Sequence, residues 1–399
     1  MDKIEEILTR GVEKIYPNKE NLEKVLRSGK KLRLYQGFDP TGTKLHIGHA
    51  VAIRKLREFQ KLGHHVIFLV GDGTGQAGDP SGKTKARDKF LTREKLRKNA
   101  RDYVNQASKI VRFEGSNPAE ILYNSDWLNK LKLVKILNIA QQFSVQQLLE
   151  RDIFQERIKK NETINLREFL YPLLQGYDSV AMNIDLEVGG TDQTFNMLTG
   201  RHLVKIFQNR EKIVMTVPLL TDKQGRKIGK TEGNVIGITD EPNELFSKIM
   251  SLGDDSIIPS FILLTDLSLP EIEKIKKQIK KGENPITFKK LLAYELTKEF
   301  NSQEEAEKAQ EEFEKVFQKG EIPANIPIVE ISKKTLPALE LFTHPKLLES
   351  RSEVKRLIAG GAIEIAGKRI ESHKELITLP AEGAIVKIGK RRVIKLTPK

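Results

Sequence analysis

The stretch LRLYQGFDPTGTKLHIGHAVAIRKLREFQKLGHHVIFLV, residues 32–70, decides the fold of this chain. Its two ends, Leu32 to Phe38 and Val66 to Val70, are apolar runs with the length of buried strands. Between them an apolar face recurs at helical spacing: Ile47, Val51, Leu56, Phe59 and Leu62. A strand, a helix and a second strand form the repeating unit of parallel sheets. We therefore predict an α/β fold with a mostly parallel sheet covered by helices.

Further apolar runs extend this pattern to about residue 220. The expected strands are 121–123, 184–188 and 213–219. The part from about 129 to 182 is strongly helical and predicts an insertion in the sheet. Within it, Ser144 is expected to cap a helix that runs to Lys160.

The pattern changes after Asp240, where only helices are expected, one of them with a capping box at Ser302 and Glu305. Pro323 and Pro327 then indicate a linker. A small α+β unit follows. The predicted domains are 1–240, with the helical insertion and a Lys-rich loop at 223–234, then 241–322, a linker at 323–335, and 336–399.

Composition limits the class of protein. The 399 residues are 38% hydrophobic and 31% charged, which suffices for a large buried core. The chain has no cysteine, so disulfides and thiolate metal sites are excluded. The first residues are acidic, and no apolar run approaches the roughly 18 residues of a membrane span. We therefore expect a cytoplasmic protein.

The basic excess is concentrated at the end of the chain. The formal net charge is +14, and residues 351–399 hold 12 Lys and Arg against 5 Asp and Glu, which is +7. This distribution favours a polyanionic partner for the last segment. A solvated basic face without a ligand is the alternative.

The glycine-rich stretch GDGTGQAGDPSGKT, residues 71–84, fits two nucleotide-binding patterns at once. A dinucleotide fingerprint requires its last glycine to lie inside a helix. Here Asp79-Pro80-Ser81-Gly82 directly follows that glycine, and these residue types are typical of a turn. A phosphate loop requires an amphipathic helix directly after Lys83-Thr84, where the sequence stays polar. The sequence therefore favours neither nucleotide-binding pattern. The glycines indicate that the backbone approaches a ligand closely.

The segment after the first strand carries more specific chemistry. His46 and His49 are three residues apart at the start of the predicted helix, next to its exposed N–H groups and the positive end of its dipole. This arrangement predicts an anion site. The alternatives are a metal pair, which lacks acidic or sulfur ligands nearby, and surface histidines without a role.

A second basic motif supports the anion site. In KQGRKIGKTEGN, residues 223–234, Lys227 and Lys230 flank Ile-Gly, so that one loop brings two ammonium groups to a triphosphate. Together, His46-Ile47-Gly48-His49 and Lys227-Ile228-Gly229-Lys230-Thr231 resemble the two signature motifs of class I aminoacyl-tRNA synthetases. The second motif departs from the family consensus, which has Met and Ser in the middle and Ser last. Both lysines are present.

A third set of residues indicates the amino acid. Tyr171, Gln175 and Asp178 lie on one face of a helix expected to begin near Pro172, and seven residues span about 10 Å, enough for both ends of a tyrosine. With VGGTDQ at 188–193, these residues resemble the bacterial tyrosyl-tRNA synthetases. The resemblance spans nearly the whole chain. It implies a Rossmann-like nucleotide-binding domain that activates L-tyrosine with ATP and transfers it to the 3′ end of tRNA.

The resemblance also implies roles for single residues. The expected tyrosine-binding residues are Tyr35, Asp79, Tyr171, Gln175, Asp178 and Gln193. The expected ATP-binding residues, with Gly190 and Asp192 at the ribose, are Gly37, Asp39, Gly48, Gly190, Asp192 and Lys230. The expected catalytic residues, which stabilise charge on the phosphates, are Thr41, His46, His49, Lys227 and Lys230.

Partners follow from the same resemblance. Magnesium is expected to accompany ATP, and the chain is expected to form a homodimer. The region 241–322 resembles an anticodon-side domain and the last unit a small RNA-binding module, with expected RNA contacts at Arg351, Lys355, Arg356, Lys390, Arg391 and Arg392. Alternatives are a tryptophan-specific relative, a phosphate-loop NTPase, and a non-catalytic RNA-binding protein that keeps the fold.

Overall fold

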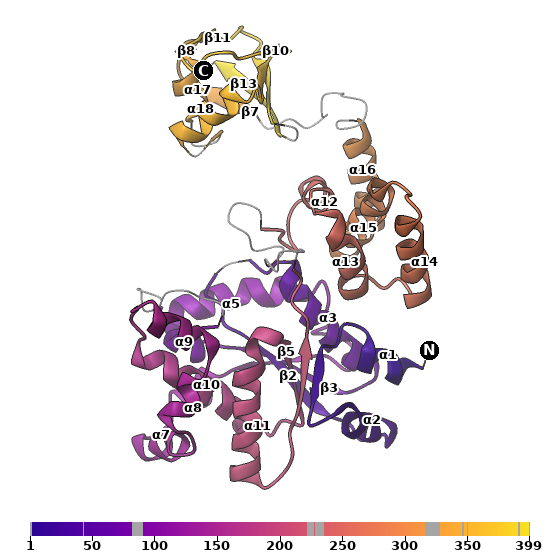
Figure 1. Cartoon of the computed structure of the whole chain (residues 1–399), viewed down its shortest axis with the longest axis vertical. Coiled ribbons are helices and arrows are strands. Elements are labelled where there is room, and N and C mark those ends of the chain that lie inside the picture. Colours follow the sequence, from indigo (N-terminus) through magenta and orange to yellow (C-terminus); the bar gives the residue numbers. More distant parts are fainter. Residues whose placement is uncertain are drawn as a thin grey trace. The chain divides into compact units, whose positions relative to one another are not determined.

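The computed structural model describes residues 2–42, 44–81, 91–221, 227, 235–315, 328–344, 347–348, 350–389 and 392–398 (Figure 1). The chain is divided into two compact units. One comprises Met1–Glu241 and Lys248–Gln303, and the other comprises Pro242–Ser247 and Glu304–Lys399.

The first unit is built on a mostly parallel sheet, as the sequence predicts. Over the described residues this sheet has six strands in the order β1-β6-β5-β2-β3-β4. Only the edge strand β1 is antiparallel. The bounds are β1 Lys14–Tyr16, β2 Arg33–Phe38, β3 His65–Val70, β4 Glu120–Tyr123, β5 Leu186–Gly190 and β6 Ile213–Val217.

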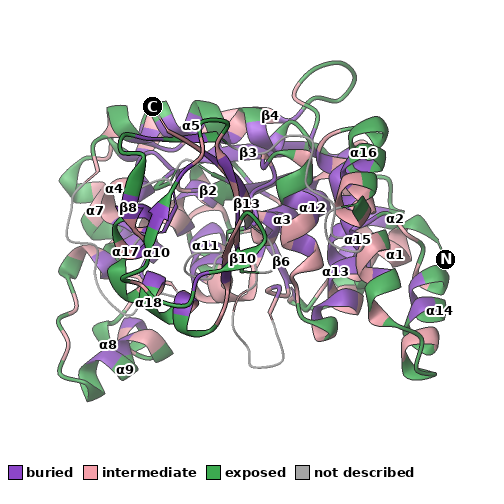
Figure 2. Ribbon diagram, turned by 90° about the horizontal axis from the view of Figure 1, so that it is seen from above, coloured by how far each residue is buried: buried purple, intermediate pink, exposed green. Residues whose placement is uncertain are grey.

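Strand order reverses between β2 and β5. The chain runs from β2 to β3 in one direction and from β5 to β6 in the other, so right-handed crossovers place α3 and α11 on opposite faces. Figure 2 shows β2 and β3 buried over most of their length. In open α/β sheets, ligands bind at such a reversal, beyond the carboxyl ends of the strands.

Helices cover this sheet. The apolar face predicted for residues 47–62 is confirmed, because Ile47, Val51, Leu56 and Phe59 of α3 are buried. The helices of this part are α1 Lys3–Thr9, α2 Lys19–Arg27, α3 Ile47–Lys61, α4 Thr74–Ala77, α5 Arg93–Ala107, α6 Ser125–Leu128, α7 Leu133–Ala140, α8 Val145–Leu149, α9 Asp152–Lys159, α10 Leu166–Ala181 and α11 Thr194–Gln208.

The single helix expected from Ser144 to Lys160 is wrong. Ser144 does cap a helix, α8, but α9 starts anew at Asp152. The backbone is extended at Arg151 between them. This break places the buried Arg151 guanidinium over the rings of Phe154 and Phe195, where it donates to Ser81 Oγ at 2.9 Å.

Two strand boundaries also differ from the prediction. The run 184–188 becomes β5 at 186–190, since Asn183 has a positive φ of 56° and ends the preceding helix. The run 213–219 ends at Val217, since Pro218 has no N–H for a further ladder bond.

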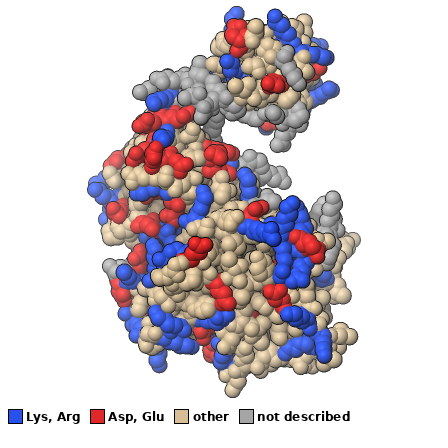
Figure 3. Space-filling view, turned by 180° about the vertical axis from the view of Figure 1, so that it is seen from behind, with Lys and Arg blue, Asp and Glu red and all other residues tan. Residues whose placement is uncertain are grey.

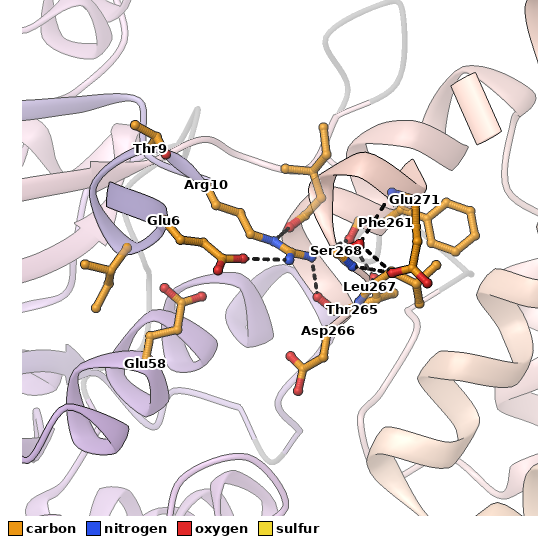
Figure 4. A network of polar contacts seen from close by, with 12 residues as sticks. Glu6, Thr9, Arg10, Glu58, Phe261, Thr265, Asp266, Leu267, Ser268 and Glu271 are labelled. Atoms are coloured by element: carbon orange, nitrogen blue, oxygen red, sulfur yellow. Dashed lines mark hydrogen bonds and ion pairs between the residues drawn. The ribbon is translucent and has the colours of Figure 1, made fainter. Parts of the chain in front are cut away.

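Helices follow the sheet, as predicted. They are α12 Pro242–Met250, α13 Ile257–Leu264, α14 Leu269–Lys280, α15 Pro285–Phe300 and α16 Gln303–Phe313. Arg10, just after α1, donates to the carbonyls of Phe261, Ile262 and Thr265 at the end of α13 (Figure 4). These carbonyls lack helical partners, so a cation is a favourable neighbour.

The last part of the chain forms a small α+β unit, as expected, but the predicted boundary at residue 336 is wrong. Residues 328–331, which the prediction placed in the linker, form a strand that pairs with residues 395–398. Its described sheet has the order β10-β9-β12-β13-β7. Val354 and Ile358 of α18 belong to its apolar core. The elements are β7 Ile328–Ile331, β8 Thr335–Pro337, α17 Ala338–Phe342, α18 Arg351–Ala359, β9 Ile363–Ile365, β10 Lys368–Arg369, β11 Leu376–Thr378, β12 Ala384–Ile388 and β13 Arg392–Pro398.

Among the described residues, no helix combines the length and apolar character that crossing a membrane requires.

Candidate active site

A cavity of about 620 Å³ lies at the carboxyl ends of β2 and β5, where the strand order reverses. It brings together most of the residues singled out from the sequence. Those that line it are Tyr35, Gly37, Asp39, Thr41, His46, Gly48, His49, Asp79, Tyr171, Gln175, Asp178, Gly190, Asp192, Gln193 and Lys227.

Three of these residues come from α10, and the predicted start of that helix is wrong. The helix begins at Leu166, with a capping box between Asn165 and Glu168, and Pro172 lies inside it. Arg157 holds the Glu168 carboxylate at 3.0 Å, so the cap is itself fixed. The expected common face is nevertheless present, because Tyr171, Gln175 and Asp178 all reach the cavity.

The Asp178 carboxylate is buried and held by two donors. Asn124 Nδ2 donates to it at 3.0 Å and Trp127 Nε1 at 2.7 Å. Burial raises the pKa of Asp178 well above its usual value, and the two donors act in the opposite direction. With both oxygens already accepting, Asp178 is built as a hydrogen-bond acceptor.

Tyr35 of β2 lies beside this carboxylate. Its hydroxyl is 3.0 Å from Ser179 Oγ. Burial, then the charges of Glu187 and Asp178, raise the pKa of Tyr35 well above its usual value, so the hydroxyl stays protonated. A protonated hydroxyl and an acceptor carboxylate together match a ligand hydroxyl, which both donates and accepts.

A second group of polar side chains lines another part of the cavity. Gln193 Nε2 donates to Asp79 Oδ2 at 2.9 Å, and Tyr171 Oη donates to Asp39 Oδ2 at 3.0 Å. Gln175 Nε2 donates to Glu187 Oε1 at 3.2 Å. Carboxylates and amide oxygens in such numbers suit a cationic group of the ligand.

The two histidines lie at the start of α3, although His46 is the cap and not the first helical residue. Gly48 N–H donates to His46 Nδ1 at 3.1 Å, and His46 N–H donates to His49 Nδ1 at 3.2 Å. The ring centroids are 3.9 Å apart. Their Nδ1 atoms therefore organise the helix start, and the positive end of the helix dipole there favours an anion.

Lys227 is the described part of the lysine loop, and its ammonium lies 2.8 Å from Asp192 Oδ2. The other expected phosphate ligand, Lys230, lies outside the described residues. Directly after the loop, Ile236 accepts from Ile47 N–H at 3.0 Å, and Ile238 donates to the Leu45 carbonyl at 3.2 Å. The chain after one motif is thus bonded to the start of the other.

Reasoning from the sequence missed Asn124, Trp127, Ser179 and Glu187. Asn124 follows β4 directly. The rule that carboxyl ends of parallel strands meet at one edge would have indicated it. Ser179 and Glu187 carry no comparable signal, because each looks like an ordinary position of a helix or a strand.

The expected RNA contacts lie in the other unit. Arg351, Lys355 and Arg356 are exposed on α18, whereas Val354 and Ile358 of the same helix are buried. Figure 3 shows Lys and Arg side chains mainly around the edge of the small α+β unit, with Asp and Glu side chains among them. Arg392 begins β13, its side chain is not described, and Lys390 and Arg391 lie outside the described residues.

Comparison with known proteins gives first a class and then a family. The family model described as tRNA synthetases class I (W and Y) matches residues 27–318. A curated tyrosine–tRNA ligase of Thermotoga maritima is 42% identical, covering 98% of this chain and 96% of that protein. One of Aquifex aeolicus is 39% identical, with 98% and 97% covered. The chain belongs to the tyrosine–tRNA ligase family of class I tRNA synthetases.

The fold agrees with this assignment. A C-terminally truncated mitochondrial tyrosyl-tRNA synthetase of Aspergillus nidulans superposes with a TM-score of 0.66 at 24% identity. The match covers 79% of this chain and 94% of that one.

Proposed function

We propose that this chain is a tyrosine–tRNA ligase, which activates L-tyrosine with ATP and transfers it to the 3′ end of its tRNA. One observation carries the choice of amino acid. Tyr35 and Asp178 line the same cavity as a donor and an acceptor, and they match a phenol hydroxyl. The indole N–H of tryptophan only donates, so a tryptophan pocket would not need both a donor and an acceptor. We therefore favour tyrosine over tryptophan as the substrate.

The first step joins two substrates in one cavity. A carboxylate oxygen of tyrosine attacks the α-phosphorus of ATP, the bond to the β-phosphate oxygen breaks, and tyrosyl-adenylate and pyrophosphate form. The nucleophile is already an anion, so no side chain has to remove a proton. The task of the protein is positioning and stabilisation of charge on the phosphates.

Each group of residues has a part in this step. We assign Asp79, Tyr171, Gln175 and Gln193 to the ammonium group of tyrosine. The start of α3 with His46, Gly48 and His49, together with Thr41, Lys227 and Lys230, is assigned to the phosphates. Gly37 and Asp39 line the nucleotide path, and Gly190 and Asp192 are assigned to the ribose.

Magnesium would enter with ATP. Within the described part of the chain, no group of three His, Asp or Glu side chains is placed to hold a metal. Mg²⁺ commonly takes substrate phosphates and waters as most of its ligands, so such a protein cage is not required. When bound, the ion neutralises charge on the β- and γ-phosphates.

In the second step a terminal hydroxyl of tRNA attacks the tyrosyl carbonyl, and AMP leaves. We assign phosphate contacts to Arg351, Lys355, Arg356, Lys390, Arg391 and Arg392 of the last unit, in a separate module joined through the linker. Both substrates of this step belong to translation, and we therefore place the protein in the cytoplasm.

We also propose that the chain is a homodimer, joined through the apolar face of the helical insertion. Leu133, Val134 and Leu137 of α7 are 68%, 78% and 58% exposed, and Leu166 of α10 is 75% exposed. The three side chains of α7 are spaced i, i+1 and i+4, which places them on one face, and an exposed apolar face of this kind marks a protein interface. Val134→Asp should yield a monomer in light scattering. The control Leu376→Asp, at a leucine of the last unit that is 68% exposed, should leave the dimer intact, and a monomeric unmodified chain would contradict the proposal.

One assay separates the candidate functions. Labelled pyrophosphate should exchange into ATP when tyrosine is present and not when tryptophan replaces it. Exchange with tryptophan would indicate the related enzyme, ATP hydrolysis without an amino acid would indicate an NTPase, and no turnover would indicate an RNA-binding protein.

A further inference from the structure

Lys212 is a buried lysine that the mechanism above does not use. It precedes β6, is 0% exposed, and donates to a Glu187 carboxylate oxygen. It also donates to Ser179 Oγ at 2.7 Å and to the Met197 carbonyl at 3.3 Å. An ammonium group has three N–H donors, so all three have partners. The group is therefore held in one place behind the cavity.

Two of these partners connect Lys212 with the tyrosine-binding residues. Ser179 Oγ is 3.0 Å from Tyr35 Oη, and Glu187 Oε1 accepts from Gln175 Nε2 at 3.2 Å. The Lys212–Glu187 ion pair is thus connected by hydrogen bonds to two residues of the cavity. One connection runs through Ser179 to Tyr35, and the other runs from Glu187 to Gln175.

The direction of the first chain follows from what each group can donate. Lys212 only donates, so Ser179 accepts from it. The Ser179 proton then has Tyr35 Oη at 3.0 Å or Glu187 Oε2 at 3.5 Å, and the shorter contact is the better hydrogen bond. With the Tyr35 oxygen accepting, its own proton points away from Ser179.

A bound phenol requires this direction. Its proton goes to the acceptor Asp178, so its oxygen needs a donor from another residue. Asn124 already donates to Asp178 and to Thr74 Oγ1, and Trp127 donates to Asp178. Tyr35 is then the hydroxyl that donates to the phenol oxygen.

The second chain sets the orientation of an amide. A carboxylate only accepts, so Gln175 turns its NH₂ group toward Glu187 and presents Oε1 on the other side. That oxygen is buried, and no group in the described residues donates to it. It suits the ammonium group of the amino acid, which only donates.

We propose that the buried Lys212–Glu187 pair, acting through Ser179, is a positioning device that sets the hydrogen-bond polarity at both ends of the bound tyrosine. It turns the Tyr35 hydroxyl into a donor toward the phenol and the Gln175 amide into an acceptor toward the ammonium. The inference rests on the proposed function, in which this cavity binds tyrosine.

Ser179→Ala tests the phenol end. The hydroxyl chain is broken while the ion pair remains, and kcat/KM in pyrophosphate exchange should fall about tenfold for tyrosine and little for phenylalanine, since one hydrogen bond is lost. The control Ser260→Ala, an equally buried serine of α13, should leave both values unchanged. An unchanged ratio of tyrosine to phenylalanine in Ser179→Ala would overturn the proposal.

A double-mutant cycle excludes a merely structural effect. Ser179 acts through the Tyr35 hydroxyl, so in a Tyr35→Phe background Ser179→Ala should cause no further loss of discrimination. Equal losses in both backgrounds would overturn the proposed route.

The double variant Lys212→Met with Glu187→Gln tests both ends without leaving a buried charge unpaired. The KM for tyrosine and for phenylalanine should rise about tenfold, because Gln175 loses its fixed orientation. Discrimination should fall as in Ser179→Ala. A folded double variant with wild-type KM values would overturn the proposal, and if it does not fold, the Ser179→Ala ratio decides. Absence of tyrosine-dependent exchange in the unmodified chain would instead refute the proposed function.

Discussion

Lys227 forms an ion pair at the cavity with Asp192 Oδ2, at 2.8 Å. We expect Lys227→Ala to slow tyrosine activation by about two orders of magnitude, the usual loss when one preorganised donor to a charged transition state is removed. Tyrosine affinity should stay unchanged, because Lys227 is assigned to the phosphates. Pyrophosphate exchange and equilibrium tyrosine binding measure the two quantities. Lys205→Ala, another lysine paired at the surface, is the control, and a rate within threefold of wild type would remove Lys227 from the mechanism.

His64 gives the first unit a dependence on pH. Its Nδ1 accepts from the buried Leu32 N–H at 3.2 Å, and burial, followed by the Lys31 charge, lowers the pKa of His64. The unfolded chain therefore binds a proton at a higher pH than the folded one, and stability falls as pH drops below about 6.5. His64→Asn keeps an acceptor without the titration. Chemical denaturation between pH 7 and 5 should show a flatter decline for it, by on the order of 1 kcal/mol, whereas an identical decline would contradict the assignment.

At the scale of single residues, the sequence indicates the residues that face a ligand better than the residues that hold them in place. Histidines, lysines and a polar helix face stand out because their spacing is improbable for a core. Ser179 and Glu187 become significant only through Lys212, which lies far along the chain, and no local pattern contains that contact.

The crossing of α10 and α11 depends on glycine. A Cβ on Gly200 would lie 2.6 Å from Lys212 Nζ, 2.9 Å from Ser179 Oγ and 3.3 Å from Gly176 Cα. In an open helix, Gly→Ala stabilises by about 1 kcal/mol. Here we expect Gly200→Ala to destabilise the unit by about 1–3 kcal/mol through overpacking. Chemical denaturation measures whether the free energy of unfolding falls or rises, and Lys205→Ala on the same helix is the control. A raised denaturation midpoint for Gly200→Ala would show that the helix crossing has room for a methyl group.

Helix boundaries show why elements are predicted better than their ends. Periodicity placed α3 and the common face of α10 correctly, because burial repeats with the helix. Pro172 in the sequence indicates a helix start, yet the capping residue Asn165 lies about two turns earlier, and its partner Glu168 is held by the buried Arg157. The break at Arg151 likewise depends on tertiary contacts with aromatic rings and Ser81.

At the scale of the whole molecule, the sequence predicts the order of the parts because composition changes along the chain. The parallel sheet, the helices after it and the small α+β unit all appear in that order. The turn expected after Gly78 in the glycine-rich loop agrees with the structure, because α4 has only four residues and Gly78, with φ +87°, ends it. A long helix receiving a pyrophosphate is absent from its described residues.

The last unit offers a test of how the two reactions are divided between the parts. It has its own apolar core and holds half of the basic excess, while the cavity belongs wholly to the first unit. A chain ending near residue 325 should therefore exchange pyrophosphate within about twofold of the full chain but charge tRNA at least about tenfold more slowly near physiological salt. Since phosphate contacts weaken as salt rises, the difference should narrow in higher salt. The full chain with Arg351, Lys355 and Arg356 changed to Ala should charge tRNA at a rate between those of the full and the shortened chain. Full charging by the shortened chain would show that the last unit is dispensable.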